Sequence, residues 1–118
     1  MKRIILLCLF LGRTVVAMVA QSTVNYSEDI APIILENCTV CHREGEIGPM
    51  PLTSFEEVRN WGFMIKYVTE IKYMPPWPPD QEYSHFLGER GLSDEEIALI
   101  AEWVDNDMPE GDPEAAPE

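Results

Sequence analysis

Two cysteines and a histidine stand within five positions, in the order Cys38-Thr39-Val40-Cys41-His42. Two thiols at this spacing can each add to one vinyl group of a porphyrin and form two thioether bonds, and Cys-x-x-Cys-His is the attachment pattern of haem c. The histidine that follows is carried under the iron, where it can bind the metal as an axial ligand. The pattern therefore predicts one covalently attached haem whose iron is bound by His42.

Three other interpretations of Cys38 and Cys41 are open. A redox disulfide of the thioredoxin type belongs in a βαβ pattern, which the sequence does not show. A zinc site with His42 and His85 would need a second pair of ligands at suitable spacing, and none follows. The two cysteines could also be ordinary buried thiols. The third cysteine, Cys8, lies in the apolar run near the N-terminus and is given no role.

The second axial position of the iron is expected to be filled by Met74. This residue precedes prolines at positions 75, 76, 78 and 79, which cannot continue a helix and hold the methionine on a stiff, extended arm. A thioether opposite a histidine raises the reduction potential of the iron. Other candidates for this position are Met50, Met64, Met108 and His85, the last of which would give a bis-histidine iron.

Helices must position these residues, because ten prolines and few β-branched runs argue against a sheet protein. The first helix is expected to begin at Asp29, with Ser27 as an alternative cap, and to run into the haem motif at Cys38. Its apolar residues recur at helical spacing and predict one buried face: Ile30, Ile33 and Ile34.

The second helix is expected to begin at a capping box formed by Thr53 and Glu56 and to run to about Lys72. Gly62 inside this helix costs about 1 kcal/mol relative to alanine, so it indicates close approach to another helix or to the porphyrin. The predicted apolar stripe of the helix contains Phe55, Val58, Trp61 or Gly62, Ile65, Val68 and Ile71.

The third helix is expected to begin at a second capping box, formed by Ser93 and Glu96, to cross the first helix and to close the core. The chain should fray from Pro109 onward. The predicted buried face of this helix contains Ile97, Ile100, Trp103 and Val104.

The loop over residues 43–52 is rich in glycine and proline and is expected to wrap one side of the haem. The backbone carbonyl of Pro49 is the candidate acceptor for the ring N–H of His42, a bond that would orient the ring. Trp61 and Trp77 are the tryptophans expected to contact the haem.

The first residues have the pattern of an export signal. Lys2 and Arg3 precede an apolar run, Arg13 interrupts it, and cleavage is expected after Ala20. The uninterrupted run is short for a bilayer span, and a retained N-terminal membrane anchor is the alternative. The sequence thus predicts a periplasmic or otherwise exported protein with a signal peptide at 1–20, one domain at 21–112 and an acidic disordered tail at 113–118.

All 21 acidic residues lie beyond position 20, where they stand against five Lys and Arg, a net charge of −16. This balance argues against nucleic acid or an anionic membrane as a partner. It favours a redox protein with a basic docking face, because opposite fields steer the encounter, although the charge could also serve only solubility. We expect a monomer with no membrane span in its mature form.

The chain resembles class I cytochrome c: a first helix ends in the haem motif, a Met-Pro pair follows on the far side, and a last helix opens with Leu-Ser-Asp-Glu-Glu-Ile. More narrowly, residues 26–112 resemble an exported bacterial monohaem module often found beside copper-dependent monooxygenase or redoxin domains. The marks of this module are the segments 27–33, 38–42, 45–49, 74–77 and 103–105.

This resemblance implies His42 and Met74 as axial ligands of one haem c. It also implies an all-α fold, a small bundle of three main helices with long proline-rich loops around the covalently bound haem. No copper-binding histidine cluster follows, so the monooxygenase chemistry is not implied for this chain.

The expected function is an electron carrier and not an enzyme, because catalysis at the metal needs an open coordination position with acid–base groups nearby. The alternatives are a haem enzyme, a gas or redox sensor in which the distal methionine is displaced, and a subunit that feeds electrons to a copper monooxygenase.

Overall fold

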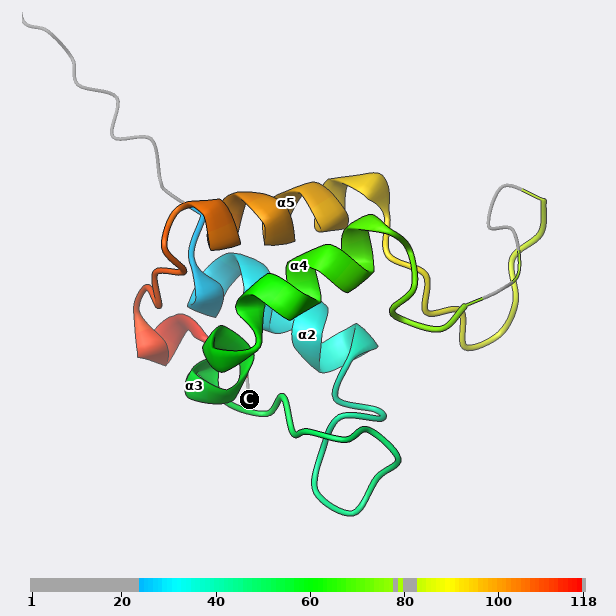
Figure 1. The fold of residues 1–118 in the computed structure, drawn as a ribbon, viewed down its shortest axis with the longest axis horizontal. Coiled ribbons are helices and arrows are strands. Elements are labelled where there is room, and N and C mark those ends of the chain that lie inside the picture. The colour runs from blue at the N-terminus through cyan, green and yellow to red at the C-terminus, as the bar shows by residue number, and fades with distance from the viewer. Residues whose placement is uncertain (1–23, 78, 80–82, 118) are drawn as a thin grey trace, which may run out of the picture.

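Regular structure in this chain is helical wherever the computed structural model describes it, over residues 24–77, 79 and 83–117 (Figure 1). No strand occurs in these ranges, and the predicted all-α class is confirmed. The predicted signal peptide, residues 1–20, lies outside the described residues, as does Pro78 of the proline-rich arm.

The first helical segment begins after Asn25, earlier than the predicted Asp29. The Asn25 side chain accepts a hydrogen bond from the Glu28 N–H at 3.0 Å, and the Asp29 carboxylate accepts one from the Asn25 N–H at 2.8 Å. These reciprocal bonds satisfy backbone donors that the start of a helix leaves free. A π-helical turn, η1 (Tyr26–Ile30), therefore precedes α2 (Ala31–Asn37), which ends at the haem motif as predicted.

The predicted second helix is two helices, α3 (Phe55–Asn60) and α4 (Gly62–Glu70), which meet at Trp61. The φ and ψ angles of Trp61, −103° and 5°, depart from the helical region. Gly62 is buried, and a Cβ on it would overlap the thioether sulfur of Met108. The glycine therefore marks a close approach, as expected, but the neighbour is a methionine that follows the last helix.

The capping box of α3 lies one residue later than predicted. Ser54 accepts a hydrogen bond from the Glu57 N–H at 3.3 Å, and the Glu57 carboxylate accepts one from the Ser54 N–H at 3.1 Å. The same carboxylate accepts the N–H and the hydroxyl of Thr53, at 2.8 and 2.9 Å. These bonds, with those from Thr53 foremost, hold the pKa of Glu57 below its ordinary value. The predicted pair of Thr53 and Glu56 is therefore wrong.

The last helix, α5 (Asp94–Asp105), begins at the predicted capping box. Ser93 accepts a hydrogen bond from the Glu96 N–H at 3.2 Å, and the Glu96 carboxylate accepts one from the Ser93 N–H at 2.8 Å. Three residues of its predicted inner face are buried: Ile100, Trp103 and Val104. The fourth, Ile97, is partly exposed.

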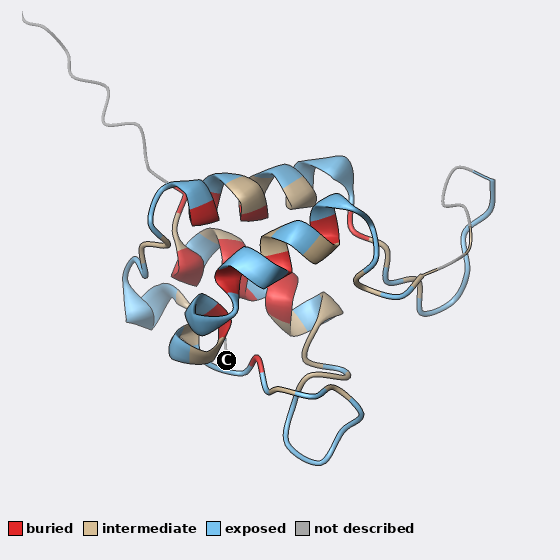
Figure 2. Cartoon of the chain, in the orientation of Figure 1, coloured by how far each residue is buried: buried red, intermediate tan, exposed pale blue. Residues whose placement is uncertain are grey.

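The core lies where the inner faces of η1, α2, α3, α4 and α5 meet, and Figure 2 shows the buried residues concentrated on these faces. α5 packs along α4 and also contacts η1 at the start of the first helical segment. The largest fully buried side chains of the core are Trp103, Ile30, Ile34, Ile100 and Val58. None of the helices in the described ranges is long and apolar enough to span a bilayer.

The segment after α5 is docked against the start of η1. The N–H groups of Tyr26 and Ser27 donate to the carbonyls of Pro109 and Glu110, both at 2.9 Å. The prediction that the chain frays from Pro109 is therefore wrong, since these residues close the bundle. The predicted tail over 113–118 contains one exposed 3₁₀ turn, η2 (Pro113–Ala115).

Candidate functional site

The haem motif forms one tight turn at the end of α2. The N–H of Cys38 donates to the Ile34 carbonyl at 2.8 Å, and the N–H groups of Cys41 and His42 both donate to the Cys38 carbonyl, at 3.1 and 2.9 Å. The turn therefore gathers the three side chains at one end of α2. Both cysteines are free thiols.

The thiol of Cys38 is not activated as a redox nucleophile. Burial, and then the neighbouring Cys41, raise the pKa of the Cys38 thiol to about 12. Redox-active cysteines have the opposite property, a lowered pKa that supplies thiolate at neutral pH. The environment of the pair thus argues against a thioredoxin-type function.

The imidazole of His42 is held in one orientation by the backbone of the following loop. Its Nδ1 lies 3.1 Å from the carbonyl oxygen of Met50. A carbonyl oxygen can only accept, so Nδ1 is the donor, and the neutral imidazole in this orientation has its lone pair on Nε2, the form that binds a metal. The sequence assigned this acceptor to Pro49; the structure places it one residue later, while the Pro49 side chain is exposed.

Gly48 closes the loop back onto the motif. Its N–H donates to the Cys41 carbonyl at 2.7 Å, and the N–H of Leu52 donates to the His42 carbonyl at 2.9 Å. A Cβ at position 48 would lie 2.5 Å from the Cys41 oxygen and 2.8 Å from the His42 Nδ1. Only glycine fits here, and the sequence analysis missed this role because it depends on the path of the loop.

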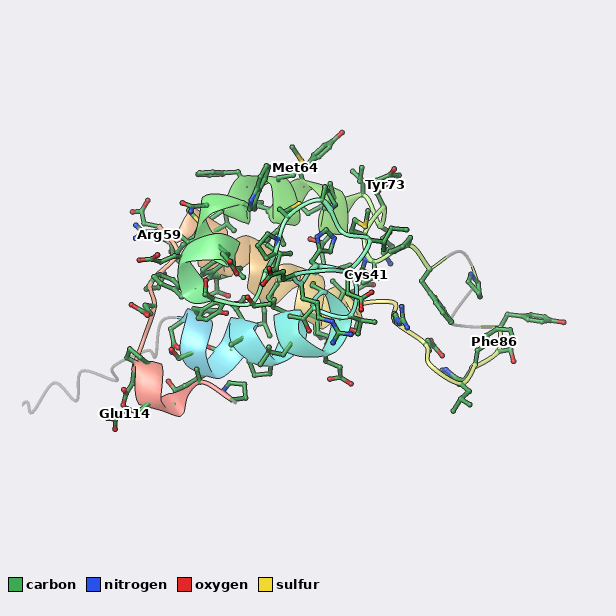
Figure 3. The ribbon with its side chains drawn as sticks, turned by 90° about the horizontal axis from the view of Figure 1, so that it is seen from below. Cys41, Arg59, Met64, Tyr73, Phe86 and Glu114 are labelled. Atoms are coloured by element: carbon green, nitrogen blue, oxygen red, sulfur yellow. The ribbon has the colours of Figure 1, made fainter. Side chains whose placement is uncertain are left out.

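A row of apolar side chains along α4 and its two cap residues is left uncovered by the described residues. These side chains have exposed fractions between 42% and 58%, and we call them the outer α4 stripe: Trp61, Met64, Tyr67 and Ile71. Figure 3 shows Met64 pointing away from the packed helices. Because Gly62 and Ile65 on the opposite face are buried in the core, α4 is apolar on two sides. A helix of this kind requires a second apolar body against it.

Met74 lies beyond the C-terminal end of α4. The N–H groups of Tyr73 and Met74 donate to the Val68 carbonyl, at 2.9 and 3.1 Å, which ties the arm to the helix. In Figure 3, Cys41 and Tyr73, the neighbour of Met74, lie toward the same end of the helices. Met74 lines a cavity of about 350 Å³ between the ends of α4 and α5, together with Leu92.

Trp77 lines the same cavity and carries an unsatisfied donor. Its Nε1 is buried and has no hydrogen-bond partner among the described residues. Its ring meets Phe86 edge-on, with the centroids 6.4 Å apart. A buried N–H without an acceptor costs about 1–3 kcal/mol, so this position calls for an acceptor from a bound group.

The other candidate iron ligands occupy different surroundings. His85 is exposed in a loop, where its Nδ1 lies 3.1 Å from Glu89. Met108 packs beside Gly62, at the end of α4 away from Met74. Met64 belongs to the outer α4 stripe, and the half-buried Met50 packs against the core.

The residues present fit a haem in four respects: free thiols on one turn, an imidazole with Nε2 open, an uncovered apolar helix face and a buried donor without an acceptor. Within the described ranges, no group of three or more His, Cys, Asp or Glu side chains is placed to hold a metal ion by itself. No protein-family model matches this sequence, and neither the curated proteins nor the solved structures searched contain a match.

Proposed function

We propose that this chain is an exported monohaem c-type cytochrome that carries single electrons between redox partners. Its helices would form a small bundle around one covalently bound haem, which would supply a one-electron iron couple. The hydrogen bond from His42 Nδ1 to the Met50 carbonyl carries this proposal, because it leaves Nε2 open beside two free thiols.

Each part of the chain has a defined task in this proposal. Cys38 and Cys41 would form the thioether bonds, and His42 and Met74 would be the ligands of the iron. The outer α4 stripe would cover part of the porphyrin and keep water from it. The Nε1 of Trp77, which has no partner among the described residues, would donate to a carboxylate of the group.

The chain acts as a carrier and not as an enzyme in this proposal, since Met74 fills the position that a substrate would need. Its arm is tied to Val68 through two backbone bonds and continues into proline. These bonds and the prolines would hold Met74 in place as a ligand of the iron. The acidic surface favours a redox partner with a basic docking face.

The iron ligands can be tested by absorption spectra of the holoprotein, expressed with its export signal in a host that attaches haem c. The oxidised wild type should show the weak band at the red end of the visible range that marks iron–methionine coordination. Met74→Ala should lose this band, and its reduced form should bind carbon monoxide. Met108→Leu is the matched control, because Met108 packs beside Gly62 at the end of α4 away from Met74, and it should keep the band.

Retention of the band in Met74→Ala would remove Met74 from the ligand set. Ready binding of carbon monoxide by the reduced wild type would contradict the carrier function and favour a haem enzyme or a gas sensor.

A further inference from the structure

The loop that follows the haem motif carries an apolar tip in full contact with solvent. Ile47 is 89% exposed, and Val40 in the motif itself is 37% exposed. Pro49 and Pro51 are exposed on the same loop. Large apolar side chains gathered on one loop cost solubility without adding to the core, and such patches mark interaction surfaces.

This tip is fixed in position relative to the motif. Ile47 is bonded directly to Gly48, whose N–H binds the Cys41 carbonyl at 2.7 Å. Arg43 and Glu46 brace the turn through a backbone bond of 3.2 Å and an ion pair of 3.1 Å. A pre-formed loop loses little conformational entropy when a partner binds it.

The charges around the tip select the partner. Glu44 and Glu46 are exposed on the same loop, and Arg43 is paired with Glu46. The patch thus has an apolar centre and a net negative rim. A second copy of this chain would bring the same negative rim and the same net charge, so self-association at this surface is opposed by like-charge repulsion.

We propose that the loop over residues 43–51, with the exposed Ile47, Pro49 and Pro51 as its apolar residues and Glu44 and Glu46 as its negative charges, docks a redox protein that presents an apolar centre ringed by Lys or Arg. This inference rests on the proposed function, since it identifies where electrons enter and leave the same site. Docking here would place the partner on the loop whose Gly48 N–H binds the Cys41 carbonyl at 2.7 Å.

The probe for this surface is an electrode coated with a mixed monolayer of methyl-ended and amine-ended thiols, which imitates an apolar, basic partner. The holoprotein is compared with E44Q at the loop, which leaves the Arg43–Glu46 ion pair in place, and with E102Q, which removes the same charge from α5, on the opposite side of the molecule from the loop (Figure 1). The interfacial electron-transfer rate of E44Q should fall by about twofold or more, because charges at the docking surface govern productive encounter. The rate of E102Q should stay close to that of the wild type.

The apolar centre is tested on the same electrode with Ile47→Ser. Its matched control is Leu87→Ser, because Leu87 is fully exposed on the loop near Phe86, which projects away from the helices (Figure 3). Ile47→Ser should lower the amount of electroactive protein bound, and Leu87→Ser should not.

Equal losses of electron-transfer rate or of bound protein in the loop variants and in their controls would overturn the inference. Such a result would mean that only the net charge or non-specific apolar adsorption governs binding to the electrode. A wild-type holoprotein with no redox wave on any electrode would contradict the proposed function itself, which separates the two failures.

Discussion

The Nδ1 atom of His42 lies 3.1 Å from the carbonyl oxygen of Met50, and this contact fixes both the tautomer and the direction of the imidazole. The bond depends on the closed loop between the two residues, which Gly48 pins to Cys41. A short loop rich in glycine and proline thereby orients the imidazole of His42.

Replacement of Gly48 by alanine should disturb this arrangement. The added Cβ would overlap the Cys41 carbonyl and crowd the His42 ring, so we expect a loss of about 1–3 kcal/mol in unfolding free energy and a lower haem content. Denaturant titration and the ratio of haem to protein absorbance measure both. Pro49→Ala, which leaves every backbone carbonyl of the loop in place, is the control and should resemble the wild type; an equal loss there would show that any substitution in this loop disturbs the motif.

Replacement of Trp103 by phenylalanine should destabilise the bundle without touching the haem site. Trp103 is fully buried, and its Nε1 donates to the Pro109 carbonyl at 3.0 Å. Loss of this bond leaves a buried carbonyl short of one donor, and we expect about 1–2 kcal/mol less stability in urea titrations. Unchanged stability would show that the docking of the segment after α5 does not depend on this bond.

The stability of the protein should fall in acid partly through Glu57. Hydrogen bonds from Thr53 and Ser54 hold the pKa of Glu57 below its ordinary value of 4.5 in the folded state. A carboxylate with a lowered folded pKa adds stability above its unfolded pKa and loses it as the pH falls through the folded pKa. The unfolding free energy of Glu57→Gln should therefore fall less steeply below pH 4.5 than that of the wild type.

Glu56→Gln is the control for that experiment, because Glu56 is exposed and lies outside the capping box that the structure shows. If Glu56→Gln changed the acid limb and Glu57→Gln did not, the predicted box would be right and the observed one wrong.

Replacement of Trp77 by phenylalanine tests the partner of its unsatisfied donor. If Nε1 binds a haem carboxylate, the holoprotein of Trp77→Phe should lose about 1–2 kcal/mol in unfolding free energy. If the donor stays unpaired in the holoprotein, removing it should be neutral or stabilising. Thermal unfolding followed at the haem absorbance distinguishes the two signs.

Local signals predicted the parts of the fold that local forces decide. The box of Ser93 and Glu96 was predicted correctly because no neighbouring pair competes with it. At α3, however, Thr53 with Glu56 and Ser54 with Glu57 offer two equivalent boxes in adjacent registers. The structure has the box of Ser54 and Glu57, and the sequence pattern alone does not distinguish it from that of Thr53 and Glu56.

The candidate site shows the same limit. The motif identified Cys38, Cys41 and His42, but the acceptor for His42 depends on where the loop turns back, and the carbonyls of Pro49 and Met50 are equally plausible in sequence. Along α4, the apolar residues of two different faces each recur at helical spacing, so the spacing does not identify the buried face. The sequence left Trp61 or Gly62 open as the core residue, and the structure buries Gly62 and exposes Trp61; Ile71, which the sequence placed in the core stripe, is exposed as well.

The most direct test of the central claim is the mass and colour of the denatured protein recovered from its exporting host. We predict that the chain retains a haem after denaturation, with a mass equal to the mature chain plus one haem and with neither Cys38 nor Cys41 open to thiol reagents. A colourless protein with both thiols free or bonded to each other would contradict the account.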